Sequence, residues 1–172
     1  MKFEGYEKAD GTIGVRDYVA VLPAVGCVNV AAQRIAAEVD TARPFLHHQG
    51  CCQLSPDLET VTTVLKGLGN NPNVSAVLLV SLGCESVSAE DIQASIGENK
   101  PVEMVRLQEL GGLTATVSEG IEKAQRLAAE ATAELGEFDV SNLTIGVKCG
   151  GSDTTSGLAS NPAVGKAVDT LI

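Results

Sequence analysis

Aromatic side chains are almost absent from this sequence of 172 residues, which has no Trp, three Phe and two Tyr. Aliphatic residues must therefore fill its interior, and an apolar share of 44% is enough for one sizeable core in a single domain. Interiors built from Val, Leu, Ile and Ala are typical of the buried parallel sheets of α/β proteins. The scarcity of aromatics thus favours that fold class.

Positive charge is scarce as well. Twelve Lys and Arg stand against 22 Asp and Glu, which gives a formal net charge of −10 and an isoelectric point near 4.6. Binding to nucleic acid or to an anionic membrane needs clustered Lys and Arg, so the sequence predicts neither partner. An anionic substrate would depend on local positive potential, such as the N-termini of helices.

Long hydrophobic runs, targeting signals and paired cysteine motifs are also missing. No window approaches the ~18 apolar residues of a membrane span, and the N-terminal residues form no apolar signal region. The five Cys contain no CxxC pair, which argues against a disulfide framework and favours free thiols in a reducing compartment. These features predict a cytoplasmic protein. Neither GxxxxGK[ST] nor a GxGxxG after a strand is present to predict nucleotide binding.

Five apolar runs alternate with helical patterns along the chain. The strands are expected over 18–25, 43–47, 74–82, 102–107 and 143–147, and the helices over 29–39, 55–68, 88–97, 116–135 and from 161 onward. This alternation predicts one three-layer, Rossmann-like α/β domain over residues 1–172, with a mainly parallel sheet of about five strands. Residues 1–15 are polar and are expected to form an N-terminal arm.

Reactive side chains follow the predicted strands, and in parallel sheets ligands bind outside the carboxyl ends of the strands. A lone Cys there is usually a small buried hydrophobe, but independent structural residues have no reason to gather at one edge. We therefore predict a functional site at this edge. Its candidates, in strand order, are Cys27; His47, His48, Cys51 and Cys52; Cys84 and Glu85; Glu109; and Cys149 and Asp153.

The segment 148–157 has the most unusual composition, because it combines a thiol, paired glycines, hydroxyls and a carboxylate. Paired glycines let the backbone approach a ligand closely or turn its N–H groups toward it. A glycine turn between a strand and a helix is the purely structural alternative.

Imidazole, thiolate and carboxylate groups together suit a borderline divalent ion such as iron(II) or zinc, whereas magnesium and calcium prefer oxygen. Such an ion would act as a Lewis acid on a carboxylate or hydroxyl of a substrate. Two other readings stay open. One is a thiol-dependent enzyme that pairs Cys51 or Cys149 with His47 or His48. The other is a non-catalytic metal- or ligand-binding module.

Three motifs occur in order along the chain. They are HHQGC at 47–51; PN at 72–73 with GCE at 83–85; and CGGSDTTSG at 149–157, followed by NPA at 161–163. In this order they resemble the motifs of the altronate dehydratase and galactarate dehydratase family, which includes the large subunit of (2R)-sulfolactate sulfo-lyase. The resemblance runs from about Arg16 to the end of the chain.

The resemblance implies a hydro-lyase or carbon–sulfur lyase that eliminates water or sulfite from a sugar acid or related hydroxy acid, with a divalent metal ion, most of all Fe²⁺. It also implies three sets of site residues. These are His47, Glu85, Ser152 and Asp153 for catalysis; His47, Cys51, Cys84 and Cys149 for the metal; and Gly150, Gly151, Ser152, Ser156 and Asn161 for the substrate.

Two departures from the family pattern matter. Cys52 stands where the family usually has glycine, so the local turn needs a conformation that tolerates a side chain. Family members are also longer. We therefore expect this chain to be part of a larger enzyme, to need a further C-terminal region or a companion small subunit, and to turn over little substrate alone. Assembly into a homo-oligomer stays open.

Overall fold

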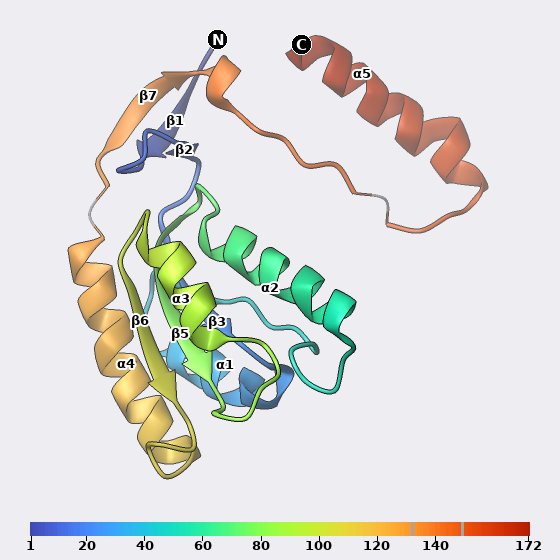
Figure 1. Ribbon diagram of the computed structural model, residues 1–172. Helices are drawn as coiled ribbons and strands as arrows, with labels where there is room; N and C mark the ends of the chain where they lie inside the picture. Colours follow the sequence, from blue (N-terminus) through green and yellow to red (C-terminus); the bar gives the residue numbers. More distant parts are fainter. Residues whose placement is uncertain (132, 149) are drawn as a thin grey trace. The chain divides into compact units, whose positions relative to one another are not determined.

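The computed structural model describes residues 1–131, 133–148 and 150–172, and its chain divides into two units (Figure 1). The first unit is Met1–Asn142 and the second is Leu143–Ile172. Among the described helices, none is both long and apolar enough to cross a membrane.

A four-stranded parallel sheet forms the centre of the first unit, in the order β4-β3-β5-β6. Strand β5 is buried along nearly its whole length, as expected for a parallel strand that is covered on both faces. The predicted α/β fold with a mainly parallel sheet is confirmed. Its strands are β3 (Tyr18–Pro23), β4 (Ala42–Pro44), β5 (Val74–Ser81) and β6 (Val102–Arg106).

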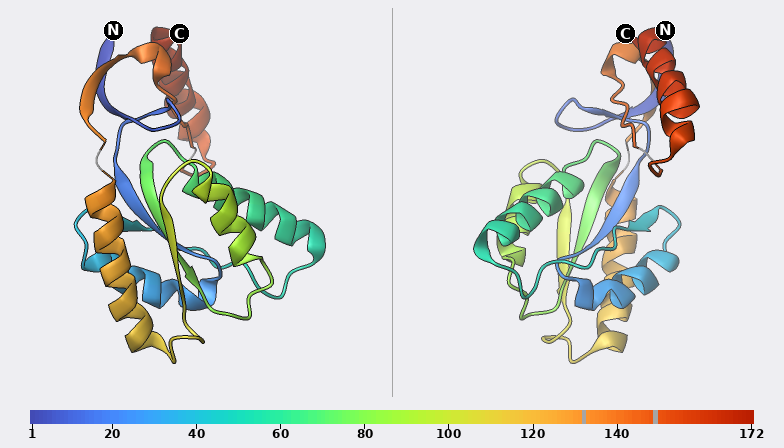
Figure 2. Two further views of the ribbon diagram at one scale, coloured as in Figure 1. Left: turned by 60° about the vertical axis from the view of Figure 1, so that its left-hand side comes forward. Right: turned by 90° about the vertical axis from the view of Figure 1, so that its right-hand side faces the viewer.

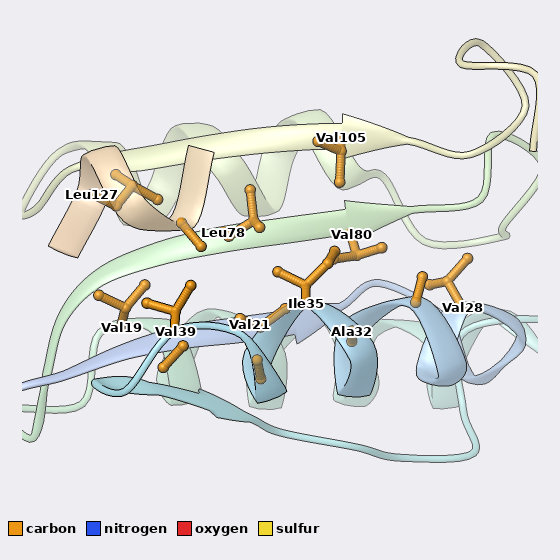
Figure 3. Close-up of a cluster of buried hydrophobic side chains, with 14 of the residues drawn as sticks. Val19, Val21, Val28, Ala32, Ile35, Val39, Leu78, Val80, Val105 and Leu127 are labelled. Atoms are coloured by element: carbon orange, nitrogen blue, oxygen red, sulfur yellow. The ribbon is translucent and has the colours of Figure 1, made fainter. Parts of the chain in front are cut away.

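Helices cover both faces of this sheet and make it the middle of three layers (Figure 2). Helices α1 (Asn29–Ala37) and α4 (Leu113–Glu130) pack on one face, and α2 (Ser55–Gly69) and α3 (Ala89–Gly97) pack on the other. Figure 3 shows the first face, where aliphatic side chains interdigitate as the composition predicts. Examples from this cluster are Val21, Ile35, Leu78, Val105 and Leu127.

A second, antiparallel sheet has the order β2-β1-β7. It consists of β1 (Lys2–Glu7), β2 (Ile13–Gly14) and β7 (Leu135–Asp139). The rings of Phe3 and Phe138 lie across the β1–β7 pair with centroids 6.3 Å apart. Much of the polar arm expected at the N-terminus is therefore strand.

One predicted strand was wrong. Residues 143–147, expected as a fifth parallel strand, have no regular secondary structure and belong to the second unit. The side chains of Ile145 and Val147 are more than half exposed, so this apolar run is not buried as a sheet strand would be. The long helix is confirmed with shifted ends, since α4 begins at Leu113 and ends at Glu130 instead of spanning 116–135.

The second unit is an extended segment followed by a helix. A π-helical turn at Ser156–Ser160 leads directly into α5 (Asn161–Leu171), so the predicted start of the last helix is confirmed. Short π-helical turns often mark functional segments, because they displace side chains from the regular helical register.

Candidate functional site

Backbone hydrogen bonds connect the loops at the carboxyl ends of the four parallel strands. The N–H of Gly26 donates to the carbonyl of Gln49 (3.0 Å), and the N–H of Ser86 donates to the carbonyl of Gly50 (2.9 Å). The N–H of Gln108 donates to the carbonyl of Leu82 (3.1 Å). The loops that carry Cys27, His47, Cys51, Cys84 and Glu109 thus lie at one edge of the sheet, as predicted.

His47 uses both ring nitrogens on the backbone. Its Nδ1 accepts from the N–H of Gln49 (3.1 Å), which leaves Nε2 to donate to the carbonyl of Pro23 (2.7 Å). The imidazole therefore holds the loop after β4 against the end of β3. In this arrangement neither nitrogen is free to bind a metal ion or to act as a base for Cys51.

Asn29 contacts the loop after β4 from the start of α1. A 3₁₀ turn at Gly26–Val28 precedes α1, and Asn29 is the first residue of that helix. Its amide Nδ2 donates to the carbonyl of His47 (2.7 Å). Its buried Oδ1 has no partner among the described residues.

The carboxylate of Glu85 organises the loop after β5. It accepts hydrogen bonds from the hydroxyl of Ser81 (2.5 Å) and from the N–H groups of Gly83 (2.7 Å) and Leu82 (3.2 Å). Burial raises the pKa of Glu85, but these hydrogen bonds together lower the pKa by more than burial raises it. The pKa of Glu85 therefore lies below its usual value. Glu85 is therefore a carboxylate that fixes the loop, and it is poorly suited to donate a proton.

Gln108 contacts the thiol of Cys84, a contact that the sequence pattern did not indicate. Its Nε2 donates to Cys84 Sγ over 3.3 Å. Gly83 permits this approach, because it has a φ of +113°, and a Cβ there would lie 2.8 Å from Gln108 Oε1. The only signal available in the sequence was the place of Gln108 directly after a strand end.

Arg106 is a second residue that the sequence reasoning missed. Its Nε donates to the hydroxyl of Ser81 (3.1 Å), the same hydroxyl that donates to Glu85. Its guanidinium also pairs with Glu109 (2.8 Å) and Glu90. This network links the ends of β5 and β6 and places a cation beside the loop that carries Cys84.

Cys51 and Cys52 bring two thiols into contact at the turn after β4. Their Sγ atoms lie 3.6 Å apart, and the hydrogen bond with Cys51 raises the pKa of Cys52. Cys52 has a φ of +58°, the left-handed conformation in which glycine is favoured. The backbone conformation of Cys52 is thus one that glycine adopts without strain, which agrees with the glycine expected at this position.

The predicted metal ligands are only partly brought together. Within the described ranges, no three or more His, Cys, Asp or Glu side chains gather closely enough to hold a metal ion. Cys149, one of the predicted ligands, lies outside the described residues, as does Thr132. The metal set of His47, Cys51, Cys84 and Cys149 stays a prediction.

In the second unit, Asp153 caps the beginning of the helical segment. Its Oδ1 accepts from the N–H and the hydroxyl of Thr155 (2.8 and 2.5 Å) and from the N–H of Ser156 (3.2 Å). The Thr155 hydroxyl and the N–H groups of Ser156 and Thr155 hold the pKa of Asp153 below its usual value. Asp153 is therefore an ionised carboxylate, and the hydrogen bonds it accepts from the described residues go to one of its two oxygens.

A hollow of about 550 Å³ in the second unit collects most of the residues predicted to bind substrate. Ser152 is not among its lining residues. Lys148 also lines it and supplies positive charge in an otherwise acidic chain. The predicted residues along its wall are Gly150, Gly151, Asp153, Ser156 and Asn161.

Two family models match the chain. The model described as D-galactarate dehydratase/Altronate hydrolase, second domain, matches residues 5–132. The model described as D-galactarate/Altronate dehydratase, C-terminal, matches residues 140–172. The step from one model to the other falls within a few residues of the boundary between the two units.

Curated relatives match almost the whole chain. The altronate dehydratase of Bacillus subtilis is 33% identical over 181 residues, which cover 99% of this chain and 36% of that protein. The (2R)-sulfolactate sulfo-lyase subunit beta of Chromohalobacter salexigens is 36% identical over 172 residues, with coverages of 98% and 43%. The galactarate dehydratase (L-threo-forming) of Escherichia coli is 28% identical over 192 residues, with coverages of 99% and 37%. The chain thus spans less than half the length of these relatives. Because the second-domain model matches most of its residues, the chain belongs to the D-galactarate dehydratase/altronate hydrolase family.

Proposed function

We propose that the chain supplies the second domain and part of the C-terminal domain of a lyase that eliminates water or sulfite from a sugar acid or related hydroxy acid. Dehydratases and a sulfo-lyase among the relatives support this reaction class. The hollow in the second unit carries the proposal, because it combines a cation, paired glycines and an ionised carboxylate.

Each of these groups has a role in an elimination. Lys148 and the N–H groups of Gly150 and Gly151 bind the carboxylate of the substrate. Asp153 accepts the proton from the carbon beside that carboxylate. The electron pair of the broken C–H bond forms the C=C bond, and hydroxide or sulfite leaves from the next carbon. The resulting enol becomes a 2-oxo acid by moving one proton from oxygen to carbon.

The residues of the sheet edge have supporting roles in this proposal. His47 and Glu85 hold the loops that carry Cys51 and Cys84 at the carboxyl ends of the parallel strands. Thiolate groups suit a borderline divalent ion, with iron(II) as the first choice, and the ion would act as a Lewis acid when bound. The described residues do not gather three ligands, so no step above depends on the ion.

Location and partners complete the proposal. Cys27, Cys51, Cys52 and Cys84 are free thiols, which supports a reducing, cytoplasmic compartment. A further C-terminal region or a companion subunit would supply the remaining length of the relatives, of which the chain covers 36% to 43% in three cases.

An anaerobic assay with iron(II) tests the reaction. Altronate, galactarate and sulfolactate are offered to the chain and to a chimera in which it replaces the matching segment of the Bacillus subtilis altronate dehydratase. We expect the chimera to form a 2-oxo acid, or sulfite with sulfolactate. Asp153→Asn should lower the rate by about 100-fold or more.

The control is Asp139→Asn, which changes an exposed carboxylate of the first unit and should leave the rate unchanged. A folded chimera that is inactive on all three substrates would contradict the reaction class. Full activity of Asp153→Asn would contradict the role of that carboxylate.

A further inference from the structure

The thiols of Cys51 and Cys52 are held on the same side of one turn. Neighbouring side chains on an extended chain point to opposite faces, but the left-handed backbone of Cys52 brings the two sulfurs to 3.6 Å. Cys51 is half-buried and packs against the core of the α1–α4 face, whereas Cys52 is exposed. The pair therefore has one anchored thiol and one thiol that reaches solvent.

The packing of the fold does not explain the thiol of Cys52. A left-handed position is most easily occupied by glycine, and a side chain there strains the backbone. Because Cys52 is exposed, burial does not offset this strain. Strained residues of this kind cluster at functional sites, which points to chemistry of the sulfur.

The turn that carries the pair is fixed by side-chain hydrogen bonds. Gln53 Oε1 accepts from the N–H of Gly50 (2.8 Å), and Gln53 Nε2 donates to Gln49 Oε1 (2.6 Å). Gly50 in turn is bound through its carbonyl to the N–H of Ser86. The sulfurs are thus held 3.6 Å apart on a fixed turn. Closing them to the length of a disulfide, about 2.05 Å, would form a strained ring, because adjacent Cα atoms lie only about 3.8 Å apart.

We propose that Cys51 and Cys52 form a dithiol site that a peroxide oxidises to a disulfide between adjacent residues. The thiolate of Cys51 attacks a peroxide oxygen, the O–O bond breaks, and the products are a sulfenic acid and water or an alcohol. The second sulfur then displaces the sulfenic hydroxyl, which leaves as water with the thiol proton. Two electrons pass from the sulfurs to the peroxide, and a thiol reductant reverses the reaction.

Oxidation would remove the thiolate of Cys51 from the predicted metal ligands and so would lower iron binding. This consequence rests on the proposed function, but formation of the disulfide does not. The test below measures the sulfur chemistry alone, so a failure of the lyase proposal would leave its result unchanged.

Peptide mass spectrometry tests the proposal. The chain is treated with one equivalent of hydrogen peroxide, its free thiols are alkylated, and it is digested with trypsin. The Arg43–Pro44 bond resists trypsin, so the fragment 35–66 contains Cys51 and Cys52 and no other cysteine. We expect this fragment to be lighter by two hydrogens and unalkylated, and dithiothreitol to restore two alkylation sites.

Two variants provide the controls. Cys52→Gly keeps a residue that suits the left-handed turn, and it should leave Cys51 without a partner in the fragment. Cys27→Ser retains the pair and should behave like the wild type. A wild-type fragment that stays alkylated at both cysteines, a disulfide from Cys51 to Cys27, or a disulfide between two chains would each overturn the proposal.

Discussion

Cys52 adopts a left-handed conformation that costs an L-residue roughly 1–2 kcal/mol, and its exposed side chain gains little from packing. Cys52→Gly should therefore raise the free energy of unfolding by about 1 kcal/mol, after the greater freedom of glycine in the unfolded chain is allowed for. Urea denaturation under reducing conditions measures the change. Cys52→Ala is the matched control, because it removes the thiol but keeps the strain, and it should stay near the wild type. Equal stabilities of the two variants would contradict the assignment of strain.

Gly83 is constrained by both conformation and space. Gly83→Ala would place a methyl group at a φ of +113° and 2.8 Å from Gln108 Oε1, so we expect a loss of about 1–3 kcal/mol in the free energy of unfolding. The variant Gly83→Ala/Gln108→Ala removes the contact and keeps the backbone strain. In the Gln108→Ala background, the change Gly83→Ala should therefore lower the free energy of unfolding by less than it does in the wild type. Wild-type stability of Gly83→Ala in urea denaturation would show that the loop after β5 is not fixed as described.

Glu85 should make the folded state sensitive to acid. Its pKa in the folded state lies below the usual value of 4.5, so its contribution to stability is complete above that pH and is lost as the pH falls through the folded pKa. We expect the stability difference between the wild type and Glu85→Gln to be largest near neutral pH and to shrink on acidification. Urea denaturation between pH 3 and 7, roughly the range over which carboxylates titrate, measures it. Glu122→Gln, on the exposed side of α4, is the control. A difference that does not depend on pH would contradict the carboxylate role.

At the scale of helices and strands, local patterns identified most of the first unit. The apolar run that became β5 and the capping residue Ser88, whose hydroxyl accepts from the N–H of Asp91 (3.1 Å), carry their own signals. Strand β7 has no such signal, because it contains Gly136, Glu137 and Asp139, which are poor strand formers. It exists through pairing with β1, which lies at the other end of the first unit.

In the candidate site, too, some features follow from local sequence patterns and others depend on contacts between distant segments. Parallel topology was enough to bring the predicted loops to one edge, so Cys51 and Cys84 could be selected from the sequence. The residues that contact these loops could not be predicted from the sequence. The contact of Gln108 with Cys84 depends on the positive φ of Gly83, and the contact of Asn29 depends on an unpredicted 3₁₀ turn. The predicted strand 143–147 failed because an apolar run alone does not specify a partner strand.

Lys100 connects two elements at the opposite end of the parallel sheet. Its ammonium donates to the carbonyls of Asn71 (3.0 Å), after α2, and Val74 (2.7 Å), at the start of β5. Burial lowers the pKa of Lys100 from 10.5 to about 8, so the unfolded chain binds more protons between these two values. The free energy of unfolding of the wild type should therefore rise relative to Lys100→Met as the pH increases from 8 to 10.5.

Urea denaturation at several pH values in this range checks the Lys100 prediction. Lys166→Met, which changes an exposed residue of α5, should keep a constant difference from the wild type. A constant difference for Lys100→Met as well would mean that the ammonium is not desolvated by the fold.

At the scale of the whole chain, the two units differ in how they can be stabilised. Both hydrophobic clusters belong entirely to Met1–Asn142, whereas the described residues of Leu143–Ile172 include none that is buried. Burial of apolar surface is the main favourable term in folding, so the first unit has what it needs to fold and the second does not. The family models divide the chain at nearly the same place, which agrees with a boundary between two domains of the longer relatives.

Residues 1–142 should therefore fold alone, with a cooperative transition and a free energy of unfolding within about 0.5 kcal/mol of the full chain, as expected where no buried contact is removed. Residues 143–172 alone should show little helix in water, since an isolated helix shorter than about 12–15 residues is marginal and α5 spans Asn161–Leu171. Circular dichroism and urea denaturation of both fragments measure these properties. A fragment 1–142 that fails to fold, or loses several kcal/mol, would mean that the second unit stabilises the first. The apolar side chains of α5, among them Val164 and Leu171, are exposed. If they contact the first unit, replacing them with polar residues in the full chain should reproduce that loss of stability.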